Sequence, residues 1–119
     1  MTCQPPEIDL SNYLSTVEKV NASAVTKDFT IKGNNNGNSI LSGKGNDVIN
    51  LVSGTNSVRG GDGADKITGG TGNDILKGEN GNDILNGGAG NNTLTGGAGS
   101  DTFVAGAGND IITDYTAGQ

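Results

Sequence analysis

A nine-residue period runs through residues 33–113 without an insertion or a deletion. It can be read directly in GGTGNDILK, GENGNDILN and GGAGNNTLT, the consecutive segments that make up residues 69–95. A unit this short excludes repeats of paired helices and propeller blades, which need about 33 to 45 residues each. Nine units fit one frame, and they start at Gly33, Ser42, Leu51, Gly60, Gly69, Gly78, Gly87, Gly96 and Ala105.

Each unit has one apolar residue at its eighth position and an Asp or Asn at its sixth. One apolar residue in nine is too sparse for the buried face of a helix, which needs about three in seven. The eighth positions are Ile40, Ile49, Val58, Ile67, Leu76, Leu85, Leu94, Phe103 and Ile112. The sixth positions are Asn38, Asp47, Asn56, Asp65, Asp74, Asp83, Asn92, Asp101 and Asp110.

A turn followed by a short strand explains this pattern. Six residues rich in Gly, Asn and Asp turn the chain, because these residues tolerate left-handed backbone angles. Three residues form a strand whose middle side chain points inward. Two units then close one coil, and coils stack about 4.8 Å apart as parallel strands. The predicted fold is all-β: a right-handed parallel β-roll solenoid of nine nonapeptide units with a short N-terminal helical cap.

The segments outside the repeat define three regions: 1–32 as a cap, 33–113 as the roll, and 114–119 as the start of a C-terminal flanking segment. A short helix is expected around residues 10–20, with Asp9 as its N-cap, because apolar residues recur at helical spacing at Leu10, Tyr13, Leu14 and Val17. An alternating pattern over 25–31 predicts a strand. Ile31 lies nine residues before Ile40, so this strand is expected to form a first rung of the roll.

Composition excludes several classes of protein. The net charge of −6 disfavours nucleic acid as a partner and suits cations. The single cysteine, Cys3, excludes an intrachain disulfide framework and a cysteine-based zinc site. The N-terminus shows no cleavable signal peptide, and no stretch is long and apolar enough to span a membrane.

Three units, GGDGADKIT, GGTGNDILK and GGAGSDTFV, match the pattern GGxGxDxUx at every defined position. The chain thereby resembles the RTX (hemolysin-type) calcium-binding proteins over residues 33–113. The resemblance implies a parallel β-roll that binds calcium between the turns of successive coils. It also implies a bacterial protein secreted by a type I system, which folds outside the cell where calcium is plentiful.

The aspartates stack on one side of the predicted roll. Successive units alternate between two edges, so one edge, called here the acidic edge, carries Asp47, Asp65, Asp83 and Asp101. Two carboxylates about 5 Å apart repel by about 3 kcal/mol at an effective dielectric near 20. Three adjacent pairs would oppose closure by about 10 kcal/mol, which is comparable to the stability of a domain. We therefore expect three calcium sites, one between each adjacent pair.

The family pattern implies that backbone carbonyl groups complete these sites, since calcium takes six to eight oxygen ligands. The resemblance assigns Ser42, Lys44, Gly61 and Gly63 to the first site, Gly60, Asp62, Glu79 and Gly81 to the second, and Gly78, Asn80, Gly97 and Gly99 to the third.

The opposite edge, called here the amide edge, carries Asn38, Asn56, Asp74, Asn92 and Asp110. Its two carboxylates are never adjacent, and stacked Asn side chains can hydrogen-bond to one another without metal. We expect weak or absent calcium at the N-terminal end of this edge. Asp74 and Asp110 can each offer one carboxylate to an ion.

The expected function is calcium binding that drives folding. No enzyme activity is expected, because every carboxylate pair is a product of the repeat and no distinctive partner residue accompanies it. The alternative is a polysaccharide-binding or adhesive accessory module, for which Arg59 and Lys77 fall on one face. A larger parent enzyme or toxin is a possible partner, and open coil ends predict end-to-end self-association.

Overall fold

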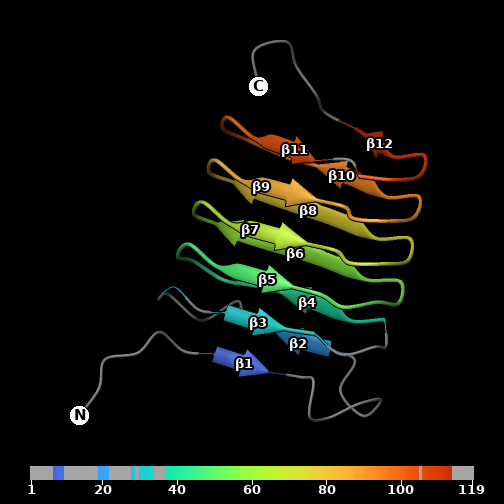
Figure 1. The fold of residues 1–119 in the computed structure, drawn as a ribbon. Coiled ribbons are helices and arrows are strands. Elements are labelled where there is room, and N and C mark those ends of the chain that lie inside the picture. Colours follow the sequence, from blue (N-terminus) through green and yellow to red (C-terminus); the bar gives the residue numbers. More distant parts are fainter. Residues whose placement is uncertain are drawn as a thin grey trace.

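The computed structural model describes residues 7–9, 19–21, 28, 30–33, 37–104 and 106–113. These residues form two parallel six-stranded sheets that lie face to face and are linked by short turns (Figure 1). The first sheet consists, in spatial order, of β1 (Glu7–Asp9), β3 (Thr30–Lys32), β5 (Val48–Asn50), β7 (Lys66–Thr68), β9 (Ile84–Asn86) and β11 (Thr102–Val104). The second consists of β2 (Lys19–Asn21), β4 (Ser39–Leu41), β6 (Ser57–Asp62), β8 (Ile75–Asn80), β10 (Thr93–Thr95) and β12 (Ile111–Ile112).

The strand register follows the repeat. Ile49 pairs with Ile67 in the first sheet, and Leu76 pairs with Leu94 in the second. Each strand thus pairs with the strand two units later, because two nine-residue units close one coil. The prediction of an all-β parallel roll is confirmed.

The core is a single ladder of apolar side chains between the two sheets. The eighth residue of each unit from Ile40 to Leu94 is at most 2% exposed, and Phe103 and Ile112 pack against this ladder as partly buried residues. Ile31 is fully buried and pairs with Ile49, which confirms it as a rung before the first unit. Leu51, at the first position of its unit, also joins the core, which the repeat pattern did not predict.

The segment before residue 33 adds strands to both sheets. β1 pairs in parallel with β3, and β2 pairs with β4. Of the helix expected around residues 10–20, residues 10–18 lie outside the described part of the chain, and Lys19 and Val20 belong to strand β2. Within the described residues, no helix has the length and apolar character that crossing a membrane requires.

The turns depend on left-handed backbone conformations at the second and fourth positions of the unit. Gly63, at a fourth position, has φ of 110°. A Cβ there would collide with the carbonyl oxygen of Gly45 in the preceding coil, so glycine is required sterically as well as conformationally. Among the described residues, Glu79 is the one non-glycine residue with positive φ, at 75°.

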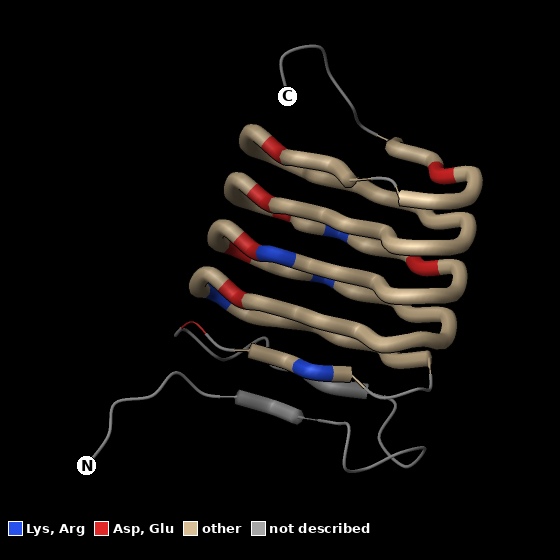
Figure 2. Tube along the Cα trace, viewed as in Figure 1, with Lys and Arg blue, Asp and Glu red and all other residues tan. Residues whose placement is uncertain are grey.

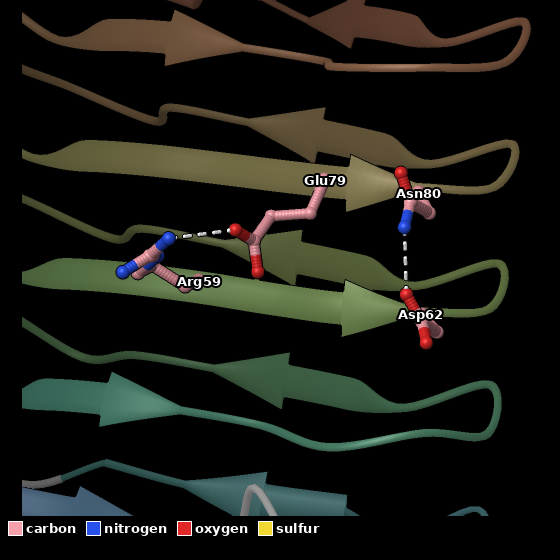
Figure 3. A network of polar contacts seen from close by, with 4 residues as sticks. All are labelled: Arg59, Asp62, Glu79 and Asn80. Atoms are coloured by element: carbon pink, nitrogen blue, oxygen red, sulfur yellow. Dashed lines mark hydrogen bonds and ion pairs between the residues drawn. The ribbon is translucent and has the colours of Figure 1, made fainter.

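The longer strands β6 and β8 bring polar side chains of neighbouring coils together (Figure 3). The Arg59 guanidinium lies 2.9 Å from the Glu79 carboxylate, and Asn80 Nδ2 donates to Asp62 Oδ1 at 2.8 Å. Both contacts are on the surface, where such pairs contribute little to stability.

Candidate metal centre

The two predicted edges exist in the fold. The residues of the acidic edge each precede a strand of the first sheet, and those of the amide edge each precede a strand of the second sheet. Figure 2 shows acidic residues in a column along one edge of the roll, with fewer on the other edge. The side chains of Asp47, Asp65, Asp83 and Asp101 are only 1–2% exposed, so the stacked carboxylates lie inside the turns.

The Oδ1 atoms of Asp65, Asp83 and Asp101 each accept a hydrogen bond from the preceding coil. The backbone N–H of Asp47 donates to Asp65 Oδ1 at 2.8 Å. In the same way, Asp65 N–H donates to Asp83 Oδ1 and Asp83 N–H to Asp101 Oδ1, each at 2.9 Å. The sixth position therefore has a structural role that is independent of metal, which is to accept the amide of the preceding coil.

The other carboxylate oxygen is left without a partner. Five Oδ2 atoms are buried and accept no hydrogen bond, namely those of Asp65, Asp74, Asp83, Asp101 and Asp110. Buried polar groups are nearly always satisfied in proteins, and an unpaired buried charge is strongly unfavourable. Each of these atoms is therefore suited to accept a cation, or to carry a proton when no cation is bound.

Glycine at the first position keeps open the space beside these oxygens. A Cβ added to Gly60 would lie 2.6 Å from Asp65 Oδ2 and 2.9 Å from the carbonyl oxygen of Gly78 in the next coil. A Cβ on Gly69 would meet Asp74 Oδ2 at 2.5 Å and the Gly87 carbonyl oxygen at 2.9 Å. The absence of a side chain thus leaves a small space between a carboxylate and a carbonyl oxygen, both of which are ligands that calcium prefers.

The oxygen atoms available at these turns suit a hard cation whose ligands are mainly backbone carbonyl oxygens. Within the described residues, no three Asp, Glu, His or Cys side chains converge on one point. Calcium can still bind here because carbonyl oxygens supply the remaining ligands, whereas zinc sites require His or Cys side chains in most cases.

The backbone carbonyl groups predicted as calcium ligands lie in segments that stack along the acidic edge. These segments are residues 42–45, 60–63, 78–81 and 96–99; the second and third include the C-terminal ends of strands β6 and β8. The carbonyl oxygen of Asn80 accepts the Gly63 N–H at 3.1 Å, which shows that it faces the preceding coil. Lys44, Asp62 and Glu79 line a shallow groove on the outside of these turns.

The first turn of the acidic edge differs from the others. Ser42 stands where the later units have glycine, and its hydroxyl donates to Asp47 Oδ2 at 2.5 Å. The hydroxyl gives Asp47 the partner that Asp65 and Asp83 lack. Sequence reasoning had assigned Ser42 only a carbonyl role and missed this contact.

The amide edge uses the same bonds between coils. Asn38 N–H donates to Asn56 Oδ1 at 2.7 Å, Asn56 N–H to Asp74 Oδ1 at 2.9 Å, and Asp74 N–H to Asn92 Oδ1 at 2.8 Å. The side-chain oxygens thus accept hydrogen bonds from backbone N–H groups of the preceding coil. The sequence analysis expected hydrogen bonds between Asn side chains and did not predict this role.

A second ladder runs along the fifth positions, which the repeat pattern leaves undefined. Asn46 Oδ1 accepts the Ala64 N–H at 2.8 Å, and Asp28 Oδ1 accepts the Asn46 N–H at 2.7 Å. Asn73, Asn82 and Asn91 accept amides of the following coil in the same way. Asn recurs at five of the nine fifth positions, and this recurrence was the signal that could have revealed the ladder.

Burial shifts the titration of the central carboxyl groups. The pKa of Asp65 is raised from 3.8 to about 8, mainly by burial; the Asp47 N–H lowers it, and the charges of Asp47, Asp83 and Asp28 add to the increase. Burial also raises the pKa of Asp83 to about 6, against the lowering effect of the Asp65 N–H. The pKa of Asp74 is raised by burial too. Without a cation, the closed roll therefore favours protonated carboxyl groups at its centre.

Acid should consequently stabilise the calcium-stripped roll. Because the pKa of Asp65 is higher in the roll than in the unfolded chain, its contribution is fully present below about pH 4 and is lost as the pH rises through about 8. Each pH unit in this window contributes up to about 1.4 kcal/mol per proton. Circular dichroism of the calcium-stripped protein should show more β-structure at pH 5 than at pH 8. Asp65→Asn should flatten this dependence, and a β signal that falls on acidification would contradict the assignment.

Stacked parallel coils with buried aspartates in glycine-rich turns define a class of calcium-binding solenoids. The family model described as RTX calcium-binding nonapeptide repeat (4 copies) matches residues 51–85 and 77–112, which together span about half of the chain. The chain belongs to this family, and its repeats form a calcium-binding β-roll module. The comparisons matched no curated protein and no solved structure.

Proposed function

We propose that calcium binding along the acidic edge drives this module to fold. The observation that carries the proposal is the column of buried carboxylates whose Oδ2 atoms lack partners at Asp65, Asp83 and Asp101. A cation between the coils would satisfy these oxygens and relieve the repulsion between successive carboxylates.

The ions would lie between Asp47 and Asp65, between Asp65 and Asp83, and between Asp83 and Asp101, with carbonyl oxygens of the stacked turns as further ligands. The second and third positions have the stronger support, because Ser42 already satisfies one oxygen at the first. On the amide edge, Asp74 and Asp110 each have an unpartnered Oδ2 and could each give one carboxylate to an ion.

Coupling to folding follows from how little else stabilises the roll. Its core is one ladder of side chains, which buries little apolar surface for the number of residues that the roll must order. Each calcium site needs oxygens from two coils, so it forms only when the coils stack, and its binding free energy becomes folding free energy. Such a module would stay largely unfolded at cytosolic calcium and fold outside the cell, as in a protein secreted by a type I system.

A calcium titration followed by far-UV circular dichroism tests this proposal, with magnesium as the control. We expect a cooperative transition from coil to β-structure in calcium and little change in magnesium, which demands octahedral geometry and dehydrates reluctantly. A complete β spectrum in chelator, unchanged by calcium, would overturn the proposal.

The surface-recognition alternative has weaker support. Arg59 and Lys77 are register neighbours on β6 and β8, as a polyanion-binding face would require. Glu79, however, forms an ion pair with Arg59 and thereby reduces the positive charge of this face. Polysaccharide binding, a parent domain and end-to-end self-association remain predictions from the sequence.

A further inference from the structure

The side-chain amide of Asn56 lies in a cage of oxygen atoms. Its Nδ2 is 2.9 Å from Asp74 Oδ1 and 3.2 Å from the carbonyl oxygen of Gly54. The carbonyl oxygens of Ser53 and Gly69 follow at 3.4 and 3.5 Å. An amide NH₂ group has only two hydrogens, so this nitrogen faces more oxygens than it can bond individually.

The backbone fixes the orientation of this amide. The N–H of Asn38 donates to Asn56 Oδ1 at 2.7 Å, and a donor of this kind requires an oxygen acceptor. The Asn56 nitrogen must therefore face the opposite side, toward Asp74 and the carbonyl groups. Asn56 is 1% exposed, so water does not compete for these contacts.

The cage around Asn56 matches the surroundings of the unpartnered aspartate oxygens. At Asp65, the Oδ2 atom and the first-position carbonyl oxygen of the next coil border the same small space. At Asn56, Nδ2 contacts the corresponding carbonyl, that of Gly69, in the next coil. In place of a carboxylate oxygen that needs a cation, this turn has a nitrogen carrying partial positive charge.

We propose that the Asn56 amide nitrogen is a built-in substitute for calcium, so that its turn closes without metal. At the Asn56 turn, the amide edge can then form without metal, and the calcium-dependent acidic edge can fold against it. Leu51, at the first position of the same unit, is 5% exposed and packs in the core where the calcium-type turns keep glycine. Asn at a sixth position thus removes the need for an ion at that turn, as the Ser42 hydroxyl relieves it at Asp47. This inference rests on the proposed function only where it predicts an additional calcium ion in the Asn56→Asp variant.

The test replaces the nitrogen by an oxygen of the same size. In Asn56→Asp, a second carboxylate would face Asp74 and the three carbonyl groups without a cation. If the wild type unfolds in chelator, we expect the calcium concentration at the folding midpoint to rise by at least about threefold, because this turn then closes only with an ion. If the wild type keeps its β-structure in chelator, we expect the thermal midpoint there to fall by at least about 5 °C. Calorimetric titration should show about one additional calcium ion per chain. Asn50→Asp makes the same chemical change at an exposed site on a sheet face and should change neither quantity.

The outcomes separate this inference from the proposed function. An Asn56→Asp variant with the wild-type midpoint and an unchanged ion count would overturn the substitute role. If the wild type binds no calcium, the proposed function fails, while the loss of stability in chelator still tests the role of the nitrogen.

A reverse exchange covers the case in which Asn56→Asp does not fold. Asp83→Asn should retain more β-structure in chelator than the wild type, because it keeps the acceptor for the Asp65 N–H and its amide nitrogen can face the carbonyl groups of its own turn. The same or less β-structure than the wild type in chelator would contradict the inference.

Discussion

Asp65→Ala is expected to raise the calcium concentration required for folding by at least about tenfold, which corresponds to about 1.4 kcal/mol for each calcium ion bound. Asp65 borders two of the proposed sites, so its removal takes a carboxylate from both. It also leaves the buried N–H of Asp47 without the acceptor that now lies 2.8 Å away, a loss that costs about 1–3 kcal/mol. No other change of a single carboxylate except that of Asp83 affects two sites in this way.

The measurement is the midpoint of a calcium titration monitored by far-UV circular dichroism. Asp62→Ala is the matched control, because it removes the same charge from the same turn at an exposed side chain while leaving the backbone carbonyl in place. Asp62 contacts only Asn80 at the surface in this network, so its midpoint should stay within about twofold of the wild type. Equal shifts in the two variants would show that the buried position of Asp65 has no special role.

Gly63→Ala is the second change with a large expected effect. Gly63 has φ of 110°, and a Cβ there would collide with the backbone carbonyl of Gly45 and lie 3.1 Å from Asn46 Oδ1. The left-handed conformation alone costs an L-residue about 1–2 kcal/mol, and the collision can be relieved only by separating two coils. We expect a destabilisation of several kcal/mol that saturating calcium does not restore.

Urea unfolding in saturating calcium measures this effect, with Ala64→Ser as the control. Ala64 is the adjacent residue, its side chain is exposed, and the substitution also adds one heavy atom. Gly63→Ala with a wild-type midpoint would mean that the coils stack more loosely than the structure shows.

The nine-residue period was sufficient to predict the main architecture. One inward-pointing strand side chain in every nine residues implied that two units close one coil. Strands eighteen residues apart should then pair, as Ile49 and Ile67 do. It also placed Asp65 and Asp83 on one edge, since alternate units must share an edge. These features depend only on the period and on the alternation of strand faces, so they could be derived without knowledge of side-chain packing.

The exceptions to the repeat could not be predicted, because their partners are one coil away or arise from the folded turn itself. Ser42 was assigned only a carbonyl role, but its hydroxyl reaches Asp47 when the turn closes. Leu51, at a first position where most units have glycine, joins the core, and the repeat pattern did not predict this. Asn56 was expected to hydrogen-bond to stacked Asn side chains, whereas its nitrogen lies in a cage of oxygen atoms from Asp74 and backbone carbonyl groups. In each case the residue type was visible, but its contacts depend on the stacking of coils.

The most direct test of the account is a crystal structure of the protein grown in calcium, with anomalous data collected at a long wavelength to locate the ions. The account predicts ions between successive coils along the acidic edge, with carboxylates of Asp65, Asp83 and Asp101 among their ligands, and no ion beside Asn56. Anomalous peaks of equal height along both edges, or none along the acidic edge, would contradict it.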